Sequence, residues 1–73
     1  MWRYKTKIGT FLIVHKDNQF HAIFEDEHLG SYTTPEQAAY ELSMGYTFWP
    51  SVGIDPGTLG ISGDLSDWEQ LNS

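Results

Sequence analysis

Apolar and polar residues along the first half of the chain follow the pattern of three short β-strands. Residues 9–16 and 19–25 are rich in β-branched and aromatic side chains, and residues 28–32 continue the pattern. The Asp-Asn pair at residues 17–18 tolerates the positive φ of a two-residue hairpin turn. A second turn is predicted at residues 26–27. We therefore expect a three-stranded antiparallel meander.

The first turn also sets the register of the hairpin, with Phe11 opposite Phe24. Successive side chains of a strand point to opposite faces of a sheet. The expected core face carries Phe11, Ile13, Phe20, Ala22, Phe24 and Leu29. The second face carries Leu12, Val14, His21, Ile23, Gly30 and Tyr32. This second face is too apolar to be left fully in water.

A helix is predicted to begin at Pro35 and to end at Gly45. Thr34 can cap its first turn, a proline at the first position gives up only an unpaired N–H, and Gln37 completes a capping box. Glycine is the usual residue just after a helix. The apolar stripe consists of Ala38, Ala39, Leu42 and Met44.

The remaining segments are less regular. Residues 55–58 (Asp-Pro-Gly-Thr) fit a type II turn, and residues 65–71 predict a short helix capped by Asp64. The apolar tail is expected to wrap the domain and cover the second sheet face with Trp49, Ile54, Leu59, Ile61 and Trp68. In residues 2–8 the side chains of Trp2, Tyr4, Thr6 and Ile8 alternate with cations, which fits either a fourth strand or an edge arm.

The fold class is therefore α+β: one domain over residues 1–73, with a meander, one helix, an aromatic-rich loop and a short C-terminal helix. A chain of 73 residues buries only about 60% of its unfolded surface. Three Trp, four Tyr and four Phe compensate with apolar bulk. The chain has no Cys, and neither a signal peptide nor a membrane span is expected, which favours the cytoplasm.

Charge is divided along the chain, whose formal net charge is −6. All four cations, Arg3, Lys5, Lys7 and Lys16, precede all ten acids. The basic segment either pairs with the acidic remainder, at about 0–1 kcal/mol for each exposed pair, or leaves a polarised surface that steers a charged partner.

Signatures of catalysis and of metal binding are weak. His15 and His21 are expected on opposite faces, and His28 lies several residues away on a neighbouring strand, so no metal site or other cofactor is expected. Residues 60–64 resemble a nucleophile elbow only superficially. Residues 25–27 form an acidic turn that water would screen. We expect a protein that is not an enzyme.

Nucleic-acid binding is also not expected. Residues 2–7 interleave rings with cations, as single-strand binders do. The isoelectric point near 4.6, however, is far from the basic footprint of such proteins.

Recognition of another protein is the preferred function. Aromatic side chains are enriched where proteins meet, and the candidates for such contacts are Tyr46, Phe48, Trp49, Trp68, Trp2 and Tyr4. The competing interpretation places these rings in the core. A homodimer is a further possibility. The alternative function is an acidic phage-type inhibitor that occupies the nucleic-acid channel of a host defence complex.

Several segments together resemble small uncharacterised bacterial proteins. They are residues 9–11, 29–32, 35–39, 48–50 and 59–61, leading to Trp68. The resemblance implies a fold, because these are turn, cap and packing residues, and it implies no activity or site.

Overall fold

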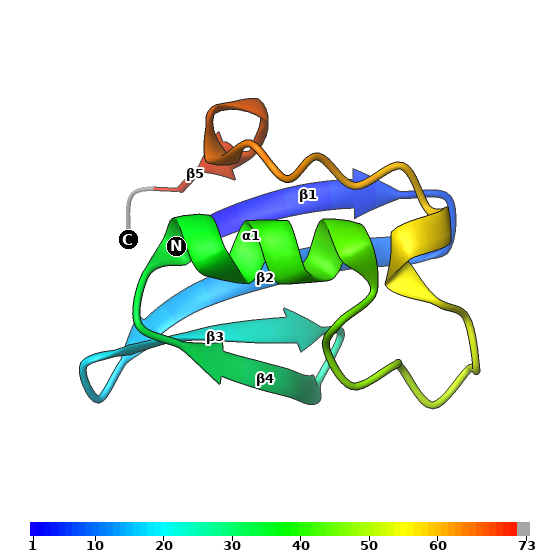
Figure 1. Cartoon of the computed structure of the whole chain (residues 1–73), viewed down its shortest axis with the longest axis horizontal. Coiled ribbons are helices and arrows are strands. Elements are labelled where there is room, and N and C mark those ends of the chain that lie inside the picture. Colours follow the sequence, from blue (N-terminus) through cyan, green and yellow to red (C-terminus); the bar gives the residue numbers. More distant parts are fainter. Residues whose placement is uncertain (72–73) are drawn as a thin grey trace.

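The structure is a computed structural model that describes residues 1–71, and it consists of an antiparallel sheet with one helix across one face (Figure 1). The strands are β1 (Trp2–Thr6), β2 (Gly9–Lys16), β3 (Gln19–Phe24), β4 (Glu27–Tyr32) and β5 (Glu69–Gln70), in the order β4-β3-β2-β1-β5. The helix α1 spans Pro35–Met44, and two 3₁₀ turns follow, η1 (Pro56–Thr58) and η2 (Leu65–Asp67). The α+β class is confirmed, and the N-terminal residues form a strand. No helix within residues 1–71 combines the length and apolar character needed to cross a membrane.

The β2–β3 hairpin has the predicted turn and register. Asp17 and Asn18 have φ of 56° and 63°, the left-handed conformation that a type I′ turn requires at both positions. Phe11 pairs with Phe24, as predicted. The second turn lies one residue earlier than predicted, at residues 25–26, because Phe24 also pairs with Glu27 on β4.

A β-bulge in β4 alters which of its side chains share a face. Ile23 pairs with His28, whereas the preceding Ala22 pairs with Gly30, so Leu29 is an extra residue on this strand. Residues beyond the bulge therefore lie on the face opposite to the one that strict alternation predicts.

The bulge corrects two assignments to the second face. Gly30 and Tyr32 pair with core-face residues of β3, and Tyr32 packs against the helix-side core. Burial raises the pKa of the Tyr32 hydroxyl, and the charge of Glu41 on α1 raises it further. The second face thus retains Leu12, Val14, His21 and Ile23.

The two caps of α1 form as predicted, but the capping box does not, because the Gln37 side-chain oxygen accepts from the Thr33 hydroxyl at 3.4 Å rather than from the N–H of Thr34. The Thr34 hydroxyl accepts a hydrogen bond from the backbone N–H of Gln37 at 3.1 Å, and Pro35 begins the first turn. Gly45 ends the helix with a φ of 72°. Met44 is exposed, so the apolar stripe ends two residues earlier than predicted, at Leu42.

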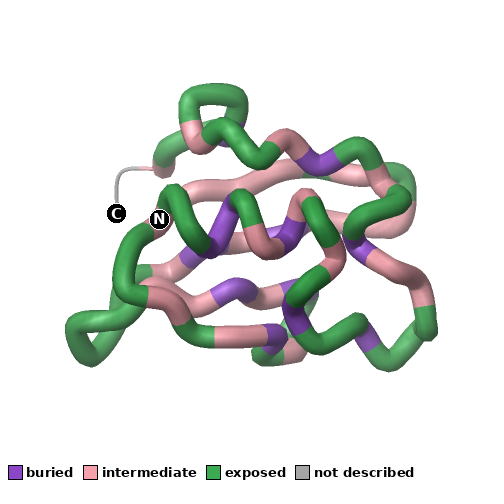
Figure 2. The backbone as a smooth tube through the Cα atoms, in the orientation of Figure 1, coloured by how far each residue is buried: buried purple, intermediate pink, exposed green. Residues whose placement is uncertain are grey.

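The core lies between the sheet and α1, and the tail contributes to this same layer. Figure 2 shows the buried positions on α1 and on the strands beneath it. The buried cluster comprises Phe11, Ile13, Ala22, Phe24, Leu29, Ala38, Ala39, Leu42, Ile61 and Trp68. The prediction that the tail covers the second sheet face is therefore wrong: Ile61 and Trp68 join the helix side, where α1 leaves space over β1. Leu12, Val14 and Ile23 are only half-buried.

Two elements predicted for the tail are wrong, each for a local reason. Residues 56–58 form a 3₁₀ turn because the Asp55 carboxylate accepts the N–H of Gly57 at 2.8 Å, and Gly57 does not take the positive φ of a type II turn. The predicted helix at residues 65–71 ends after η2, because Trp68 is extended and directs its ring into the core. The next two residues pair with β1 as β5.

We expect acid to loosen the C-terminal end of the chain. A hydrogen bond from Arg3 holds the pKa of Glu69 below its ordinary 4.5, and the backbone N–H of Ser66 holds that of Asp64 below 3.8. A lowered folded-state pKa stabilises the protein above the ordinary value, and this contribution is lost as the pH falls through the folded-state value. The thermal midpoint of Glu69→Gln should therefore lie below that of the wild type at neutral pH and approach it in acid. A difference that is the same in acid and at neutral pH would contradict this linkage.

Candidate functional site

The segment after α1, residues 46–53, exposes four large apolar side chains, and we name it the aromatic loop. The exposed fractions are 65% for Tyr46, 78% for Phe48, 52% for Trp49 and 61% for Val52. Figure 1 shows the loop extending past the C-terminal end of α1. Three of these residues are among the sequence candidates for protein binding.

Two residues of the loop, interspersed among the exposed ones, attach it to the rest of the domain. The side chains of Thr47 and Pro50 are buried. The backbone N–H of Phe48 donates to the carbonyl of Leu29 at 2.9 Å, which ties the loop to the edge strand β4. The N–H of Gly53 donates to the carbonyl of Pro50 at 2.9 Å and closes a turn.

Side chains add further attachments. The Glu27 carboxylate accepts the backbone N–H of Ser51 at 2.8 Å and its hydroxyl at 2.6 Å. Hydrogen bonds to an ionised acceptor are among the stronger ones. The indole N–H of Trp49 donates to the carbonyl of Gly45 at 3.1 Å, so this ring is also oriented. The backbone of the loop is therefore held in place while its rings face solvent.

Such an arrangement favours binding over packing as the role of the rings. Isolated exposed apolar side chains are ordinary on protein surfaces, whereas several on one short segment indicate an interaction site. A loop whose backbone is already ordered loses little further conformational entropy when a partner binds. The aromatic loop therefore has both the surface and the preorganisation that recognition requires.

Two carboxylates lie at the base of the aromatic loop. Glu27 anchors it through Ser51, and Asp55 packs against Gly45 at the helix end. The Glu25 carboxylate, by contrast, lies beside Gly9 at the start of β2. Two of the cations, Arg3 and Lys5, lie on β1, which pairs with β2 and β5 rather than with β4.

The other three sequence candidates lie in or against the core. Trp68 is only 5% exposed, and its indole N–H donates to the carbonyl of Ser62 at 2.9 Å. The Tyr4 ring packs on Trp68 with a centroid distance of 5.3 Å, and Trp2 packs on Phe20 at 6.0 Å. For these rings the structure favours the core interpretation, which the sequence left open.

The alternation of rings and cations on β1 separates them in space. Trp2 and Tyr4 pair with core-face residues of β2, whereas Arg3 pairs with Leu12 of the second face. Arg3 is also engaged by Glu69. The rings and cations of residues 2–7 therefore do not form one stacking platform for a nucleic-acid strand.

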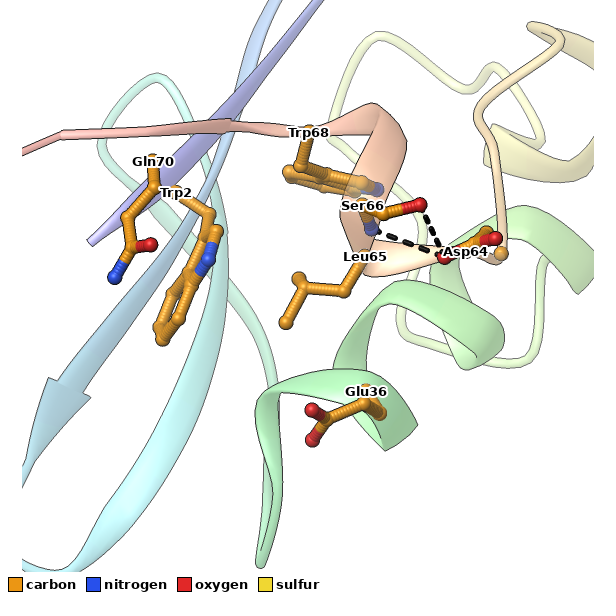
Figure 3. Close-up of a pocket in the computed structure, with 8 residues that line it drawn as sticks. Trp2, Glu36, Asp64, Leu65, Ser66, Trp68 and Gln70 are labelled. Atoms are coloured by element: carbon orange, nitrogen blue, oxygen red, sulfur yellow. Dashed lines mark hydrogen bonds between the residues drawn. The ribbon is translucent and has the colours of Figure 1, made fainter.

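A shallow pocket lies at the other end of α1. Figure 3 shows the indoles of Trp2 and Trp68 and the side chain of Leu65 arranged around it, with Gln70 and Glu36 at its margin. The Asp64 carboxylate is already engaged, accepting the N–H and the hydroxyl of Ser66 at 3.0 and 2.8 Å. The pocket combines the apolar wall of Trp2, Leu65 and Trp68 with the polar side chains of Glu36 and Gln70, so its lining does not indicate one class of ligand.

Sequence reasoning missed Val52 and the contact between Glu27 and Ser51. Val52 has no periodic pattern around it, and its exposure depends on the turn closed by Gly53. The two residues of the anchoring contact are 24 positions apart, so only the fold brings them together.

Comparison of the chain with models of known protein families, with curated proteins and with solved structures found no match.

Proposed function

We propose that this chain is a small protein-binding domain that contacts its partner through the aromatic loop. The observation that carries the proposal is the exposure of Tyr46, Phe48, Trp49 and Val52 on a backbone that is anchored from beneath. Rigid aromatic side chains supply a large contact area at low entropic cost, and they dominate the binding energy of many interfaces.

The size of an ordinary interface indicates what else the partner would touch. A stable complex buries about 800 Å² on each side, and the accessible surface of the chain is 4395 Å². The footprint would therefore extend from the loop onto the acidic turn at residues 25–26 and the end of α1. The matching partner presents an apolar hollow on a basic surface, because the chain has a formal net charge of −6 and complementary charge speeds association and excludes wrong partners.

Replacing the exposed rings should weaken binding strongly without unfolding the domain. Phe48→Ala removes the most exposed ring of the loop, and loss of an interface anchor costs about 2 kcal/mol or more, a fall in affinity of about thirtyfold. The measurement is affinity capture with the full chain from the cells that produce it, followed by titration of the captured protein. Tyr40→Ala is the matched control, because Tyr40 is a half-exposed ring on α1 outside the loop. Capture that survives Phe48→Ala and Trp49→Ala unchanged would refute the proposal.

A variant that leaves every ring in place tests the role of the anchored backbone in the same assay. Glu27→Ala removes both hydrogen bonds to Ser51 and frees the loop, so affinity should fall by about tenfold through the added cost of ordering it. Asp26→Ala removes the neighbouring charge without touching this contact. Equal losses in the two variants would show that charge, rather than loop order, controls binding.

The same titrations separate this function from the other hypotheses. Contact through rings depends weakly on salt, whereas an acidic inhibitor that occupies a nucleic-acid channel would lose affinity steeply as salt is added. Self-association through the loop would appear in gel filtration as an elution volume that depends on concentration and on Phe48.

A further inference from the structure

Two histidines and a serine meet on the second sheet face, which the aromatic loop does not use. The Nδ1 atom of His21 lies 2.9 Å from Nε2 of His28, and the hydroxyl oxygen of Ser31 lies 3.1 Å from the first nitrogen and 3.2 Å from the second. The two imidazole nitrogens and the hydroxyl oxygen thus form a nearly equilateral triangle.

The bulge in β4 brings Ser31 to the two histidines. His28 and Ser31 are three residues apart, so strict alternation would place them on opposite faces. With Leu29 as the extra residue, Ser31 pairs with His21, and His28 pairs with Ile23 on the same face. Alternation alone places His28 on the face of His21, but the sequence shows no third ligand beside them, because the bulge cannot be recognised there.

We propose that His21, His28 and Ser31 form a binding site for a divalent transition-metal ion, with the two imidazole nitrogens as the principal ligands. Imidazole is a preferred ligand of copper, nickel and zinc. No group of three or more His, Cys, Asp or Glu side chains gathers anywhere in residues 1–71, so the protein supplies two imidazoles and a hydroxyl here, and the remaining ligands come from solvent.

The separation of the two nitrogens puts both within reach of a single ion. Nitrogens 2.9 Å apart can both lie about 2.0–2.1 Å from one metal ion once the rings turn their lone pairs from each other toward it. Among divalent ions of the first transition row, Cu²⁺ binds nitrogen and oxygen donors most tightly, so it is the ion with which we test the site.

The ring of His21 is already oriented as a metal ligand. Its Nε2 lies 3.0 Å from the backbone carbonyl of Lys16, which can only accept a hydrogen bond. Nε2 therefore carries the proton, and Nδ1 presents its lone pair toward His28. Metal-binding histidines almost always donate their other N–H in this way, which sets the tautomer and the direction of the ring.

The second ring can adapt when the ion binds. In the contact without metal, His28 Nε2–H donates to the lone pair of His21. Moving that proton to Nδ1 of the exposed His28 ring frees Nε2 to bind the ion without any change in net charge. The ion then takes the place of a hydrogen bond that joins the same two atoms.

The space beside the triangle admits the remaining ligands of the ion. An open hollow is lined by Val14, Lys16, Asp17, His21, Ile23 and His28. The Asp17 carboxylate favours a cation there and the Lys16 ammonium opposes it, so the two nearest charges offset each other. Water or a small anionic ligand completes the coordination.

Titration of the untagged full chain with Cu²⁺ tests the site. We expect binding of one ion, seen by calorimetry, with nitrogen hyperfine structure from two imidazoles in the electron paramagnetic resonance spectrum. His21→Asn and His28→Asn should each weaken binding by at least tenfold, because even losing an outer-shell partner of a metal site costs about 10–100-fold. Ser31→Ala should have a smaller effect.

His15→Asn is the matched control, because His15 lies on the opposite face, where its ring stacks on Phe20. It leaves Cu²⁺ binding unchanged if the site is correct. A wild type that binds no Cu²⁺, or equal losses in the His15, His21 and His28 variants, would overturn the proposal. Circular dichroism of each variant confirms that the sheet is intact, and since His28 is exposed, its variant provides the test even if His21→Asn perturbs the fold.

Discussion

Trp68→Ala is expected to remove a large share of the domain's stability, although Trp68 stands among the sequence candidates for partner binding. Its ring is almost fully buried, packs on Tyr4 and donates a hydrogen bond to the tail. Removal of a buried tryptophan side chain costs about 3–5 kcal/mol. A domain of this length has only about 4–11 kcal/mol of stability, at about 0.05–0.15 kcal/mol per residue.

Urea denaturation followed by circular dichroism measures this loss, with Trp49→Ala as the matched control. Trp49 is half-exposed, and its replacement removes one surface hydrogen bond, which is worth about 1 kcal/mol. The two variants change the same side chain, so they differ only in where the ring lies. Equal denaturation midpoints would show that Trp68 is not part of the core.

Whether an element of this fold could be predicted depends on how far apart in the sequence its interacting residues lie. The type I′ turn and the caps of α1 depend on residues adjacent in sequence, and both were predicted correctly from Asp17, Asn18, Thr34 and Gly45. The bulge at Leu29 and the direction of the tail depend on how distant segments fill space, and both were missed. Assigning side chains to faces by strict alternation fails beyond a bulge, because one extra residue moves every later side chain to the opposite face.

The same distinction applies to the candidate site. The sequence identifies the rings, but a run such as residues 46–50 has no period that separates inward from outward side chains. Thr47 and Pro50 are buried while Phe48 and Trp49 face solvent, because Phe48 N–H bonds to β4 and Ser51 bonds to Glu27. Exposure in this loop is therefore a consequence of long-range hydrogen bonds.

Phe11→Ala and Leu12→Ala are expected to differ greatly, although the two residues are neighbours on β2. Phe11 is fully buried, and its ring centroid lies 4.6 Å from that of Phe24 on the paired strand. Replacing it should cost about 3–5 kcal/mol. Leu12 points to the second face and is half-buried, so its replacement should cost about 1 kcal/mol.

The pair of variants tests which face of the sheet is covered. Because the tail joins the helix-side core, nothing in the described chain gives Leu12 the burial of Phe11. The measurement is the free energy of unfolding of the wild type and of both variants, from urea denaturation at several protein concentrations. A loss for Leu12→Ala as large as that for Phe11→Ala would mean that the second face is covered. If that loss grew with protein concentration, the covering molecule would be a second copy of this chain, since association stabilises the folded state by mass action.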